Sequence, residues 1–350
     1  MAVPVRLLSL ATAVPPHVLH QREVVARARY LFQRNGLNID RLLPVYANAG
    51  IDTRYSCVPI DWYQEASGWK SRNELFVENA GKLLCRAAEQ CLAEAGVAAE
   101  MVDTVVAVST SGIATPSLDA RLMEILPLRR DVQRLPIFGL GCAGGVLGLA
   151  RAAAMARAEP GSTVLFLVVE LCGLTFRSHD MSKSNVIATA LFGDGAAAAL
   201  VSSAGSEDRP VIAGWGEHTW PDTLDVMGWR VEEDGFGVLF SRDIPAIVHD
   251  RYGAAVDAFL TRRSLTRADL DGMLCHPGGA KVVDALEEVF GLAPGGMADA
   301  REVLRAYGNM SAATVLFVLD RALRRGVRGR QLLSSLGPGF TAAFALLETP

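Results

Sequence analysis

The sequence is poor in charge and has no strong excess of either sign. Charged residues make up 21% of the 350 positions, and the formal net charge is −4. Such a chain has no general attraction for nucleic acid or for anionic membranes, so we expect neither as a partner. Because 50% of the residues are hydrophobic, the composition indicates a globular protein with a large core and argues against disorder.

Long apolar runs and paired cysteine motifs are also lacking. No uninterrupted apolar stretch approaches the ~20 residues that a membrane-spanning helix needs. The apolar start of the chain is interrupted by Pro15 and Pro16, so we expect a first strand there rather than a signal peptide. The six cysteines form no Cys-x-x-Cys pair, which argues against a zinc site or a disulfide framework. We therefore expect a cytoplasmic protein with reduced thiols and no bound metal.

Strand-like and helix-like segments alternate along the chain. Runs rich in β-branched or small apolar residues occur at 102–109, 163–170 and 194–202. Helical patterns occur near 73–95, 143–157, 244–262, 280–290 and 311–325. Alternation of this kind predicts a layered α/β fold.

The second half of the chain repeats the outline of the first. Residues 98–112 and 266–279 share an acidic segment, an Asp, a short apolar strand, and then polar and glycine residues. Each half also contains a Gly-x-Gly turn that leads into a strand of small residues. Such repetition indicates a duplicated unit. We expect an N-terminal half, 1–205, and a C-terminal half, 206–350, related by a pseudo-twofold axis.

The repeat predicts that three reactive side chains meet. Cys142 follows Asp103 by 39 positions (142 − 103), and Asn309 follows Asp271 by 38 (309 − 271). Both endpoints follow a glycine and open a helix of small residues. Because a pseudo-twofold axis brings equivalent loops together, Cys142 should share a pocket with Asn309 and with His276, which ends a strand of the second half.

These residue types suit acyl transfer through a thioester. A cysteine at a helix N-terminus faces the positive end of the helix dipole, and a neighbouring imidazolium would further favour the thiolate. The glycines around Cys142 let a carbonyl approach backbone amides that could form an oxyanion hole. His276 and Asn309 add two donors that could hold a thioester enolate, the species formed when a malonyl thioester loses carbon dioxide.

Together the motifs resemble those of the type III polyketide synthases, chalcone-synthase-like enzymes of the thiolase fold. The strings GCAGG, ALFGDGAAA, HPGG, GNMSAAT and GPGFT occur in the family's order, and residues 225–248 are most similar to bacterial alkylresorcinol and alkylpyrone synthases. The resemblance implies a duplicated αβαβα fold and a homodimeric acyltransferase. It further implies decarboxylative condensation of an acyl-CoA starter with malonyl-CoA, and then cyclisation. CoA thioesters would be substrates, and no cofactor would be needed.

The resemblance also implies roles for individual residues. Cys142 would hold the starter and the growing chain, while His276 and Asn309 would drive decarboxylation and stabilise the enolate. Phe192 would be a gate between the CoA tunnel and the reaction cavity. The other positions that the resemblance assigns to substrate binding are Thr110, Thr115, Glu170, Gly228, Ser311, Gly337, Pro338 and Gly339.

Some of these positions carry finer implications. Thr110, Glu170 and Ser311 match a hydrogen-bonded set that positions a water and favours aldol ring closure in stilbene-type members. The small residues Thr115 and Gly228 would leave room for a medium or long fatty acyl chain. Where many plant members place a second gating aromatic, this sequence has Val238.

Three other functions remain open from the residues alone. Gly139-x-Gly141-x-x-Gly144 also spells the dinucleotide-binding turn of an NAD(P)-dependent oxidoreductase. However, Glu170 lies 26 positions after Gly144 (170 − 144), more than the usual ~20. A β-ketoacyl synthase III-like enzyme of fatty-acid synthesis would share the fold and the triad, although such enzymes typically follow the histidine with Gln-Ala-Asn. A non-catalytic thiolase-fold partner is the third, and the complete triad argues against it.

Overall fold

One nine-stranded sheet, in the order β11-β12-β13-β8-β1-β7-β6-β4-β5, organises the computed structural model, which describes residues 3–36, 38–65 and 67–350. The first half contributes β1 (Arg6–Ala13), β4 (Thr104–Val108), β5 (Gln133–Ile137), β6 (Thr163–Leu171) and β7 (Asp194–Ser202). The second half contributes β8 (Val211–Thr219), β11 (Gly272–Cys275), β12 (Gly329–Gly337) and β13 (Thr341–Thr349).

The two halves pair their strands in the same way. β7 lies antiparallel between β1 and β6, and β13 lies antiparallel between β8 and β12. β4 is parallel to β6, as β11 is to β12. The halves join where Arg6 of β1 pairs with Val211 of β8. Of the strands that the first half contributes to this sheet, β5 alone has no counterpart among the described residues of the second half, so the duplication is clear but incomplete.

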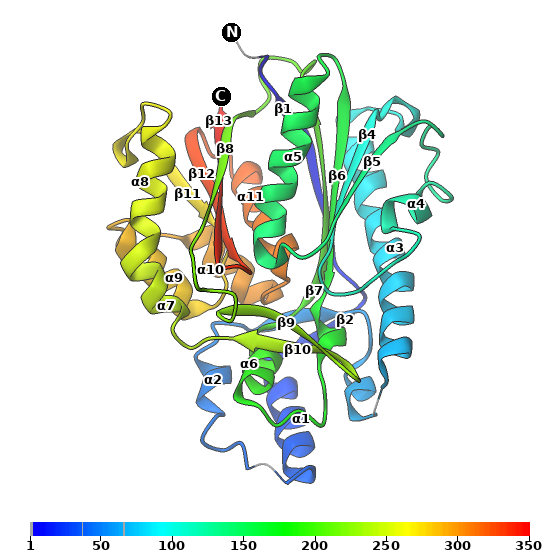
Figure 1. The fold of residues 1–350 in the computed structure, drawn as a ribbon, viewed down its shortest axis with the longest axis vertical. Helices are drawn as coiled ribbons and strands as arrows, with labels where there is room; N and C mark the ends of the chain where they lie inside the picture. The colour runs from blue at the N-terminus through cyan, green and yellow to red at the C-terminus, as the bar shows by residue number, and fades with distance from the viewer. Residues whose placement is uncertain (1–2, 37, 66) are drawn as a thin grey trace.

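Two buried helices separate the two parts of this sheet. α5 (Gly144–Ala158) and α11 (Thr314–Arg324) lie between them, with α3 (Trp69–Ala95) outside the first part and α8 (Gly253–Thr261) outside the second (Figure 1). This is the predicted α-β-α-β-α arrangement. α5 consists mainly of alanine, glycine and leucine because it is buried on nearly every side. A Cβ at Gly145 would collide with the Ala312 carbonyl, so the two central helices approach closely.

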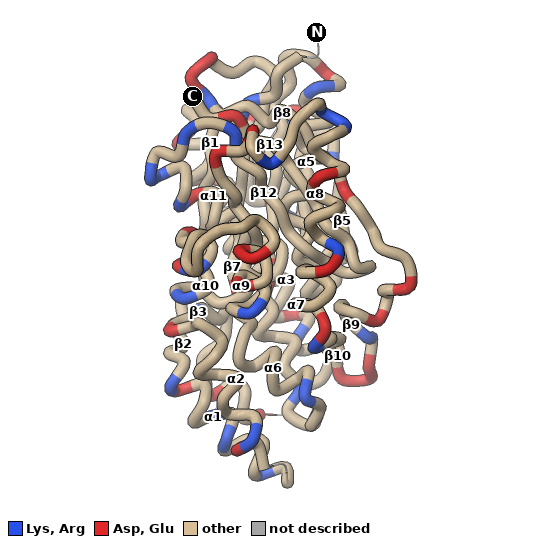
Figure 2. The backbone as a smooth tube through the Cα atoms, turned by 90° about the vertical axis from the view of Figure 1, so that its left-hand side faces the viewer, with Lys and Arg blue, Asp and Glu red and all other residues tan. Residues whose placement is uncertain are grey.

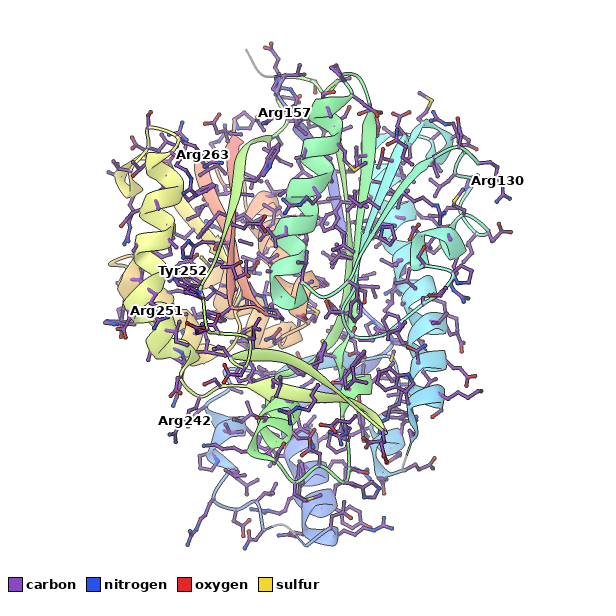
Figure 3. The ribbon with its side chains drawn as sticks, in the orientation of Figure 1. Arg130, Arg157, Arg242, Arg251, Tyr252 and Arg263 are labelled. Atoms are coloured by element: carbon purple, nitrogen blue, oxygen red, sulfur yellow. The ribbon has the colours of Figure 1, made fainter. Side chains whose placement is uncertain are left out.

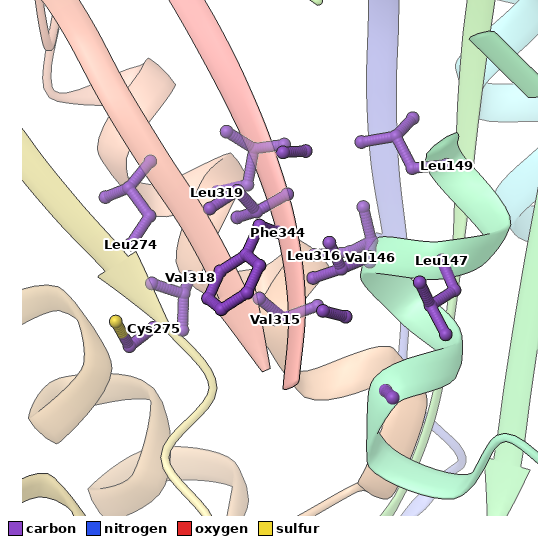
Figure 4. Packing of buried hydrophobic residues seen from close by; sticks show 14 of the residues in the cluster. Val146, Leu147, Leu149, Leu274, Cys275, Val315, Leu316, Val318, Leu319 and Phe344 are labelled. Carbon is purple, nitrogen blue, oxygen red and sulfur yellow. The ribbon is translucent and has the colours of Figure 1, made fainter. Parts of the chain in front are cut away.

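The core reflects this packing. Val146, Leu147 and Leu149 of α5 face the apolar side chains of α11 and of β13 (Figure 4). Charged residues of both signs are spread over the outer helices and loops (Figure 2). β12 and β13 carry charge only near their outer ends, where Arg330 pairs with Glu348 at 2.9 Å. Among the described residues, no helix has the length and apolarity of a membrane span.

A further group of elements surrounds one end of the sheet, at the bottom of Figure 1. It includes β2 (His17–His20), α1 (Gln21–Arg34), α2 (Pro44–Ala47), β3 (Thr53–Ser56), α6 (Lys183–Leu191) and the hairpin β9 (Met227–Glu232) and β10 (Gly235–Phe240). The remaining helices are α4 (Leu118–Leu122), α7 (Ile244–Ile247), α9 (Ala280–Val289) and α10 (Ala298–Tyr307). A short π-helix joins α7 to α8; its Tyr252 is buried toward the strands, whereas Arg251 lies at the outer surface (Figure 3).

Candidate active site

The three side chains predicted to meet line one cavity of about 770 Å³. Cys142 comes from the start of α5, His276 from the end of β11, and Asn309 from the segment before α11. The cavity is also lined by the hairpin β9–β10, by α9 and by the end of β12. The pseudo-twofold arrangement therefore brings together side chains that are more than 130 positions apart in the sequence (276 − 142 = 134).

Cys142 sits in a tight turn that the opposite half supports. The 3₁₀ turn Gly141–Ala143 precedes α5, and Gly141 has φ +48°. A Cβ at Gly141 would lie 2.5 Å from Cδ of Pro338. Position 141 therefore requires glycine for two reasons: its backbone is left-handed, and it contacts the Gly337–Gly339 loop. Neither requirement involves a nucleotide.

A second turn of the same shape precedes α11. It shows that Cys142 and Asn309, which the sequence spacing made equivalent, do not occupy equivalent positions. In Gly141–Ala143 and in Ser311–Ala313, the last amide donates to the carbonyl three residues earlier, at 3.1 and 3.2 Å. The first residue of each turn has φ near +48° and +47° respectively. The structural counterpart of Cys142 is therefore Ala312, and Asn309 lies just before its turn. The expected pocket forms nevertheless, because both turns open helices that lie side by side.

Asn309 is held on both its backbone and its side chain. Its amide donates to the Leu191 carbonyl at 2.8 Å, and its carbonyl accepts from Gly193 at 2.9 Å. Its side-chain Nδ2 donates to the Gly278 carbonyl at 3.1 Å, while Oδ1 accepts from the Ser311 amide at 2.8 Å. These two bonds fix the orientation of the carboxamide and use one of its two N–H groups. The other N–H has no partner among the described residues and can donate to a ligand.

His276 is fixed by its backbone, while its ring is left without partners. Its amide donates to the Ser334 carbonyl at 2.8 Å. The side chain is only 4% exposed, and neither ring nitrogen has a hydrogen-bond partner among the described residues. Burial lowers the pKa of this imidazole to about 3. An unpaired, buried imidazole is costly, and because His276 lines the cavity, a bound substrate would be the natural partner for its ring.

The electrostatics of the thiol differ from the sequence-based expectation. Cys142 Sγ lies 3.5 Å from Ser311 Oγ and faces the cavity. Burial raises the pKa of the thiol to about 12, the Ser311 hydrogen bond opposes this, and Glu170 adds to it. The unliganded site therefore favours a neutral thiol and a neutral imidazole. Burial of the two groups therefore opposes the thiolate–imidazolium pair that the helix dipole favours.

Glu170 supports the turn Gly141–Ala143 through Thr110. Its carboxylate is completely buried, and Oε2 accepts from the amides of Thr110 and Ser111, both at 3.0 Å, and from the Ser111 hydroxyl at 2.6 Å. Thr110 Oγ1 in turn accepts from the Gly141 amide at 3.1 Å. Burial raises the Glu170 pKa to about 7. Of the predicted set, Ser311 lines the cavity, whereas Thr110 and Glu170 do not.

Phe192 lies between this cavity and a second one of about 600 Å³, because it lines both. The second cavity lies against α1 and α6 and was not predicted from the sequence. Its lining is mainly apolar and includes Leu19, Val24, Ala28, Leu31, Cys172, Phe176 and Ala188. Residues 172–190, which look like an inserted loop in the sequence, form a 3₁₀ turn and α6, and they build one wall of this cavity.

Comparison with known families agrees with this geometry. Residues 57–205 match the N-terminal domain of chalcone and stilbene synthases, and residues 216–348 match the C-terminal domain. A putative chalcone synthase of Bacillus subtilis (strain 168) is 39% identical over 98% of both chains. The chain belongs to the chalcone and stilbene synthase family. It is thus a type III polyketide synthase, an acyltransferase of the thiolase fold, and such enzymes use acyl-CoA and malonyl-CoA.

Two tetrahydroxynaphthalene synthases illustrate the range of the family. The 1,3,6,8-tetrahydroxynaphthalene synthase of Streptomyces peucetius subsp. caesius is 36% identical over 96% of this chain and 91% of its own. The crystal structure of the Streptomyces coelicolor A3(2) enzyme has a TM-score of 0.93 and 29% identity, and covers 99% of this chain and all of that one. Family membership replaces the dinucleotide-binding and ketoacyl synthase alternatives.

The remaining predicted positions of this synthase fall into two groups. Gly228 and Pro338 line the first cavity. Gly337 and Gly339 do not, and Gly337 instead packs so closely on the turn of the nucleophile that a Cβ would lie 2.6 Å from the Ala143 amide nitrogen. Thr115 is exposed on the loop before α4 and lies outside the cavity lining. Its role in lining a pocket therefore stays a prediction that one chain does not test.

The buried guanidinium of Arg54 holds together several backbone segments near Phe192. It donates to the carbonyls of Thr189 (2.7 Å), Ala190 (2.9 Å) and Phe192 (3.1 Å), and to the Gln21 side chain. Burial lowers its pKa to about 10. It thereby fixes the end of α6 and the backbone of the gate residue. Among the described residues, no cluster of three or more His, Cys, Asp and Glu could hold a metal ion.

Proposed function

We propose that this synthase extends a medium- or long-chain fatty acyl-CoA with malonyl-CoA and cyclises the product to an alkylpyrone or alkylresorcinol. The observation that carries the proposal is the second, mainly apolar cavity beyond Phe192. Burying each methylene of an alkyl chain contributes about 0.8 kcal/mol. A mainly apolar cavity that adjoins the one lined by Cys142 favours an aliphatic starter over a small polar one.

In the proposed loading step, Cys142 is the nucleophile and His276 the base. The thiol transfers its proton to the imidazole as sulfur attacks the thioester carbonyl. The tetrahedral intermediate then expels CoA as its thiolate, which takes the proton from the imidazolium. Because the free site favours the neutral pair, this proton transfer accompanies substrate binding, and the binding energy of the starter offsets its cost.

In the proposed extension step, His276 and the free N–H of Asn309 hold the malonyl thioester carbonyl. Loss of carbon dioxide leaves an enolate whose oxygen accepts from these two donors. The enolate carbon attacks the acyl group on Cys142, and the sulfur leaves as thiolate. A cavity lined largely by apolar side chains such as Met227 and Leu286 destabilises the malonyl carboxylate relative to neutral carbon dioxide.

Ring closure is the least constrained part of the proposal. Glu170 Oε1 is buried and has no partner among the described residues, which leaves an acceptor behind Thr110 and Ser311 that could orient a water. This favours the aldol route to an alkylresorcinol. Lactonisation to an alkylpyrone requires no such group, so product analysis decides between them.

We also propose that the enzyme is a homodimer that joins through β5. β5 is the last strand of the sheet, and Phe138, next to it, is 56% exposed. A sheet edge flanked by an exposed aromatic is a ready surface for pairing with a second copy. Phe138→Asp should convert a dimer to a monomer in light scattering, and a wild-type protein that is already monomeric would contradict the dimer.

The test of the starter proposal is a panel of acyl-CoAs, from acetyl-CoA to stearoyl-CoA, each with malonyl-CoA and product identification by mass spectrometry. Ala28→Phe, which fills the second cavity from α1, should lower kcat/KM for long starters at least tenfold more than for short ones. Ala26→Phe, on the exposed side of the same helix, is the matched control. Equal losses for all starters would contradict the proposed role of this cavity.

A second candidate function follows from the relatives. The 36% identity to a tetrahydroxynaphthalene synthase suggests that malonyl-CoA itself is the starter. In the same panel, an aromatic product from malonyl-CoA alone, with no stimulation by fatty acyl-CoA, would favour this alternative.

A further inference from the structure

A row of aromatic rings runs from the gate residue to the outer helix α3. The Phe192 ring meets the Trp229 ring edge-on, with centroids 5.9 Å apart and an interplanar angle of 71°. Trp229 stacks on Phe236 at 6.0 Å, and Phe236 meets Trp69 of α3 at 4.7 Å. Offset-stacked and edge-to-face geometries are the favourable ones for aromatic pairs, so the Phe192 ring rests on a supported neighbour.

Trp229 is placed to act on the gate from the first cavity. It lies on β9, in a two-stranded sheet separate from the main one. It lines the first cavity but not the second, whereas Phe192 lines both. Directly opposite Trp229 on β10 is Val238, and opposed residues of a hairpin share one face. At this pair of opposed positions the aromatic ring is therefore carried by β9, and β10 has the smaller Val238.

The backbone of the gate residue is tied to two other segments of the chain. It is held by the bridge between Phe192 and Asn309 and by Arg54. A chain that passes from the first cavity to the second must therefore displace the Phe192 ring about its side-chain torsions. The contact with Trp229 opposes that rotation, because rotation breaks the edge-to-face pair.

We propose that Trp229 is a specificity-determining residue of this synthase: it supports the Phe192 ring between the two cavities and thereby limits how far an acyl starter extends into the second one. The inference rests on the proposed function for the identity of the starter, but the support of one ring by the other is a property of the structure. Removing the indole frees the gate, so longer starters gain relative to shorter ones.

The test is a double-mutant cycle on loading. Wild type, Trp229→Ala, Phe192→Ala and the double variant are compared by the rate at which octanoyl-CoA and palmitoyl-CoA acylate Cys142, measured by intact-protein mass. Each single change should raise the palmitoyl-to-octanoyl ratio about tenfold, and the double change should raise it no further than the larger single effect, because the residues act as one unit. Multiplying effects, or an unchanged ratio in Trp229→Ala, would overturn the proposal.

Two further variants separate support of the gate from simple enlargement. Met227→Ala enlarges the same cavity from the same face of β9 and should leave the ratio within about twofold of wild type. Trp229→Ala/Val238→Phe returns a ring to the opposite strand and should restore most of the wild-type ratio. A Met227→Ala effect as large as that of Trp229→Ala would overturn the proposal. Trp229→Leu keeps apolar bulk without the ring and guards against misfolding of the alanine variant.

This readout also separates the inference from the proposed function. If no fatty acyl-CoA loads but malonyl-CoA does, the fatty acyl starter is wrong. The cycle then runs on acetyl-CoA and malonyl-CoA, where loss of coupling between Trp229 and Phe192 would overturn the inference independently. If fatty acyl-CoA loads and the cycle shows no coupling, only the role of Trp229 is wrong.

Discussion

The two central turns have one backbone shape and opposite chemistry. The turn before α5 presents the thiol of Cys142, and the turn before α11 presents the methyl group of Ala312 at the equivalent place. The donor Asn309 instead lies just outside the second turn. Duplication thus supplied a scaffold that brings two helix starts together. Single side chains then differ between the halves, with the proposed nucleophile in one half and the proposed donors in the other.

Of the substitutions that test this difference between the two turns, Cys142→Ala should have the largest effect on activity. Loading of acyl-CoA and product formation should fall at least about a thousandfold, because the covalent step is lost. Intact-protein mass after incubation with acyl-CoA measures loading directly.

Moving the thiol from position 142 to position 312 tests whether the two turns can exchange roles. In the Cys142→Ala background, Ala312→Cys should not restore product, because position 312 is fully buried and lies outside the cavity lining. Restored acylation of residue 312 would show that the two turns are chemically interchangeable.

Removing the donors of the second half should produce the next largest effect. His276→Ala and Asn309→Ala should each slow carbon dioxide release from malonyl-CoA about 100- to 1,000-fold, the loss typical of one oxyanion donor. Cys142→Ala should retain more of this release than either, because its thiol does not hold the enolate. Labelled carbon dioxide release is the measurement, and near-wild-type release by either donor variant would remove that residue from the proposed mechanism.

The first positions of the two turns predict stability effects of opposite sign. Gly141→Ala forces a Cβ against Pro338 in a left-handed conformation and should lower the free energy of unfolding by about 1–3 kcal/mol. Ser311→Gly relieves the same conformation and should raise it, or leave it unchanged, within about 1 kcal/mol. Denaturant unfolding followed by circular dichroism measures both, and destabilisation of equal size would contradict the shared backbone shape.

The eighth position of β6 is the titratable Glu170, whereas the eighth position of the matching strand β12 is the apolar Leu336. We therefore expect a pH-dependent stability that arises in the first half alone. The Glu170 pKa is raised to about 7 in the folded state, above the ~4.3 of an unfolded chain. Between these values the folded state binds the extra proton, so stability falls as pH rises from about 4 to 7. Relative to Glu170→Gln, wild type should lose about 1–3 kcal/mol over this range in urea unfolding. A parallel pH profile for the two proteins would show that folding does not raise the Glu170 pKa.

The sequence predicts the fold and the meeting of the triad well, for a physical reason. The duplication repeats local patterns of strand, glycine turn and small-residue helix, and motifs such as GCAGG and HPGG mark where each strand or helix ends. The offset between Cys142 and Asn309 is predicted wrongly, since spacing alone does not identify which residue begins a turn.

Other features depend on contacts between distant segments and have no local pattern. The second cavity requires α1 and α6 to pack together, and Trp229 acquires its place from a hairpin outside the main sheet. The direction of the Cys142 pKa shift follows from how completely the fold excludes water from the site. Thr115 matches its motif, but one chain leaves it exposed.

The bridge between Phe192 and Asn309 joins the backbone of the residue proposed to gate the starter to that of the residue proposed to hold the enolate. A substitution that shifts the main chain at one of these residues also reorients the other, so altered substrate range would come with impaired enolate chemistry. Exchanging only the ring at 192 avoids that penalty. Engineers who wish to change the starter range of this scaffold can therefore substitute the aromatic side chains, but they should leave the segment 191–193 at its present length.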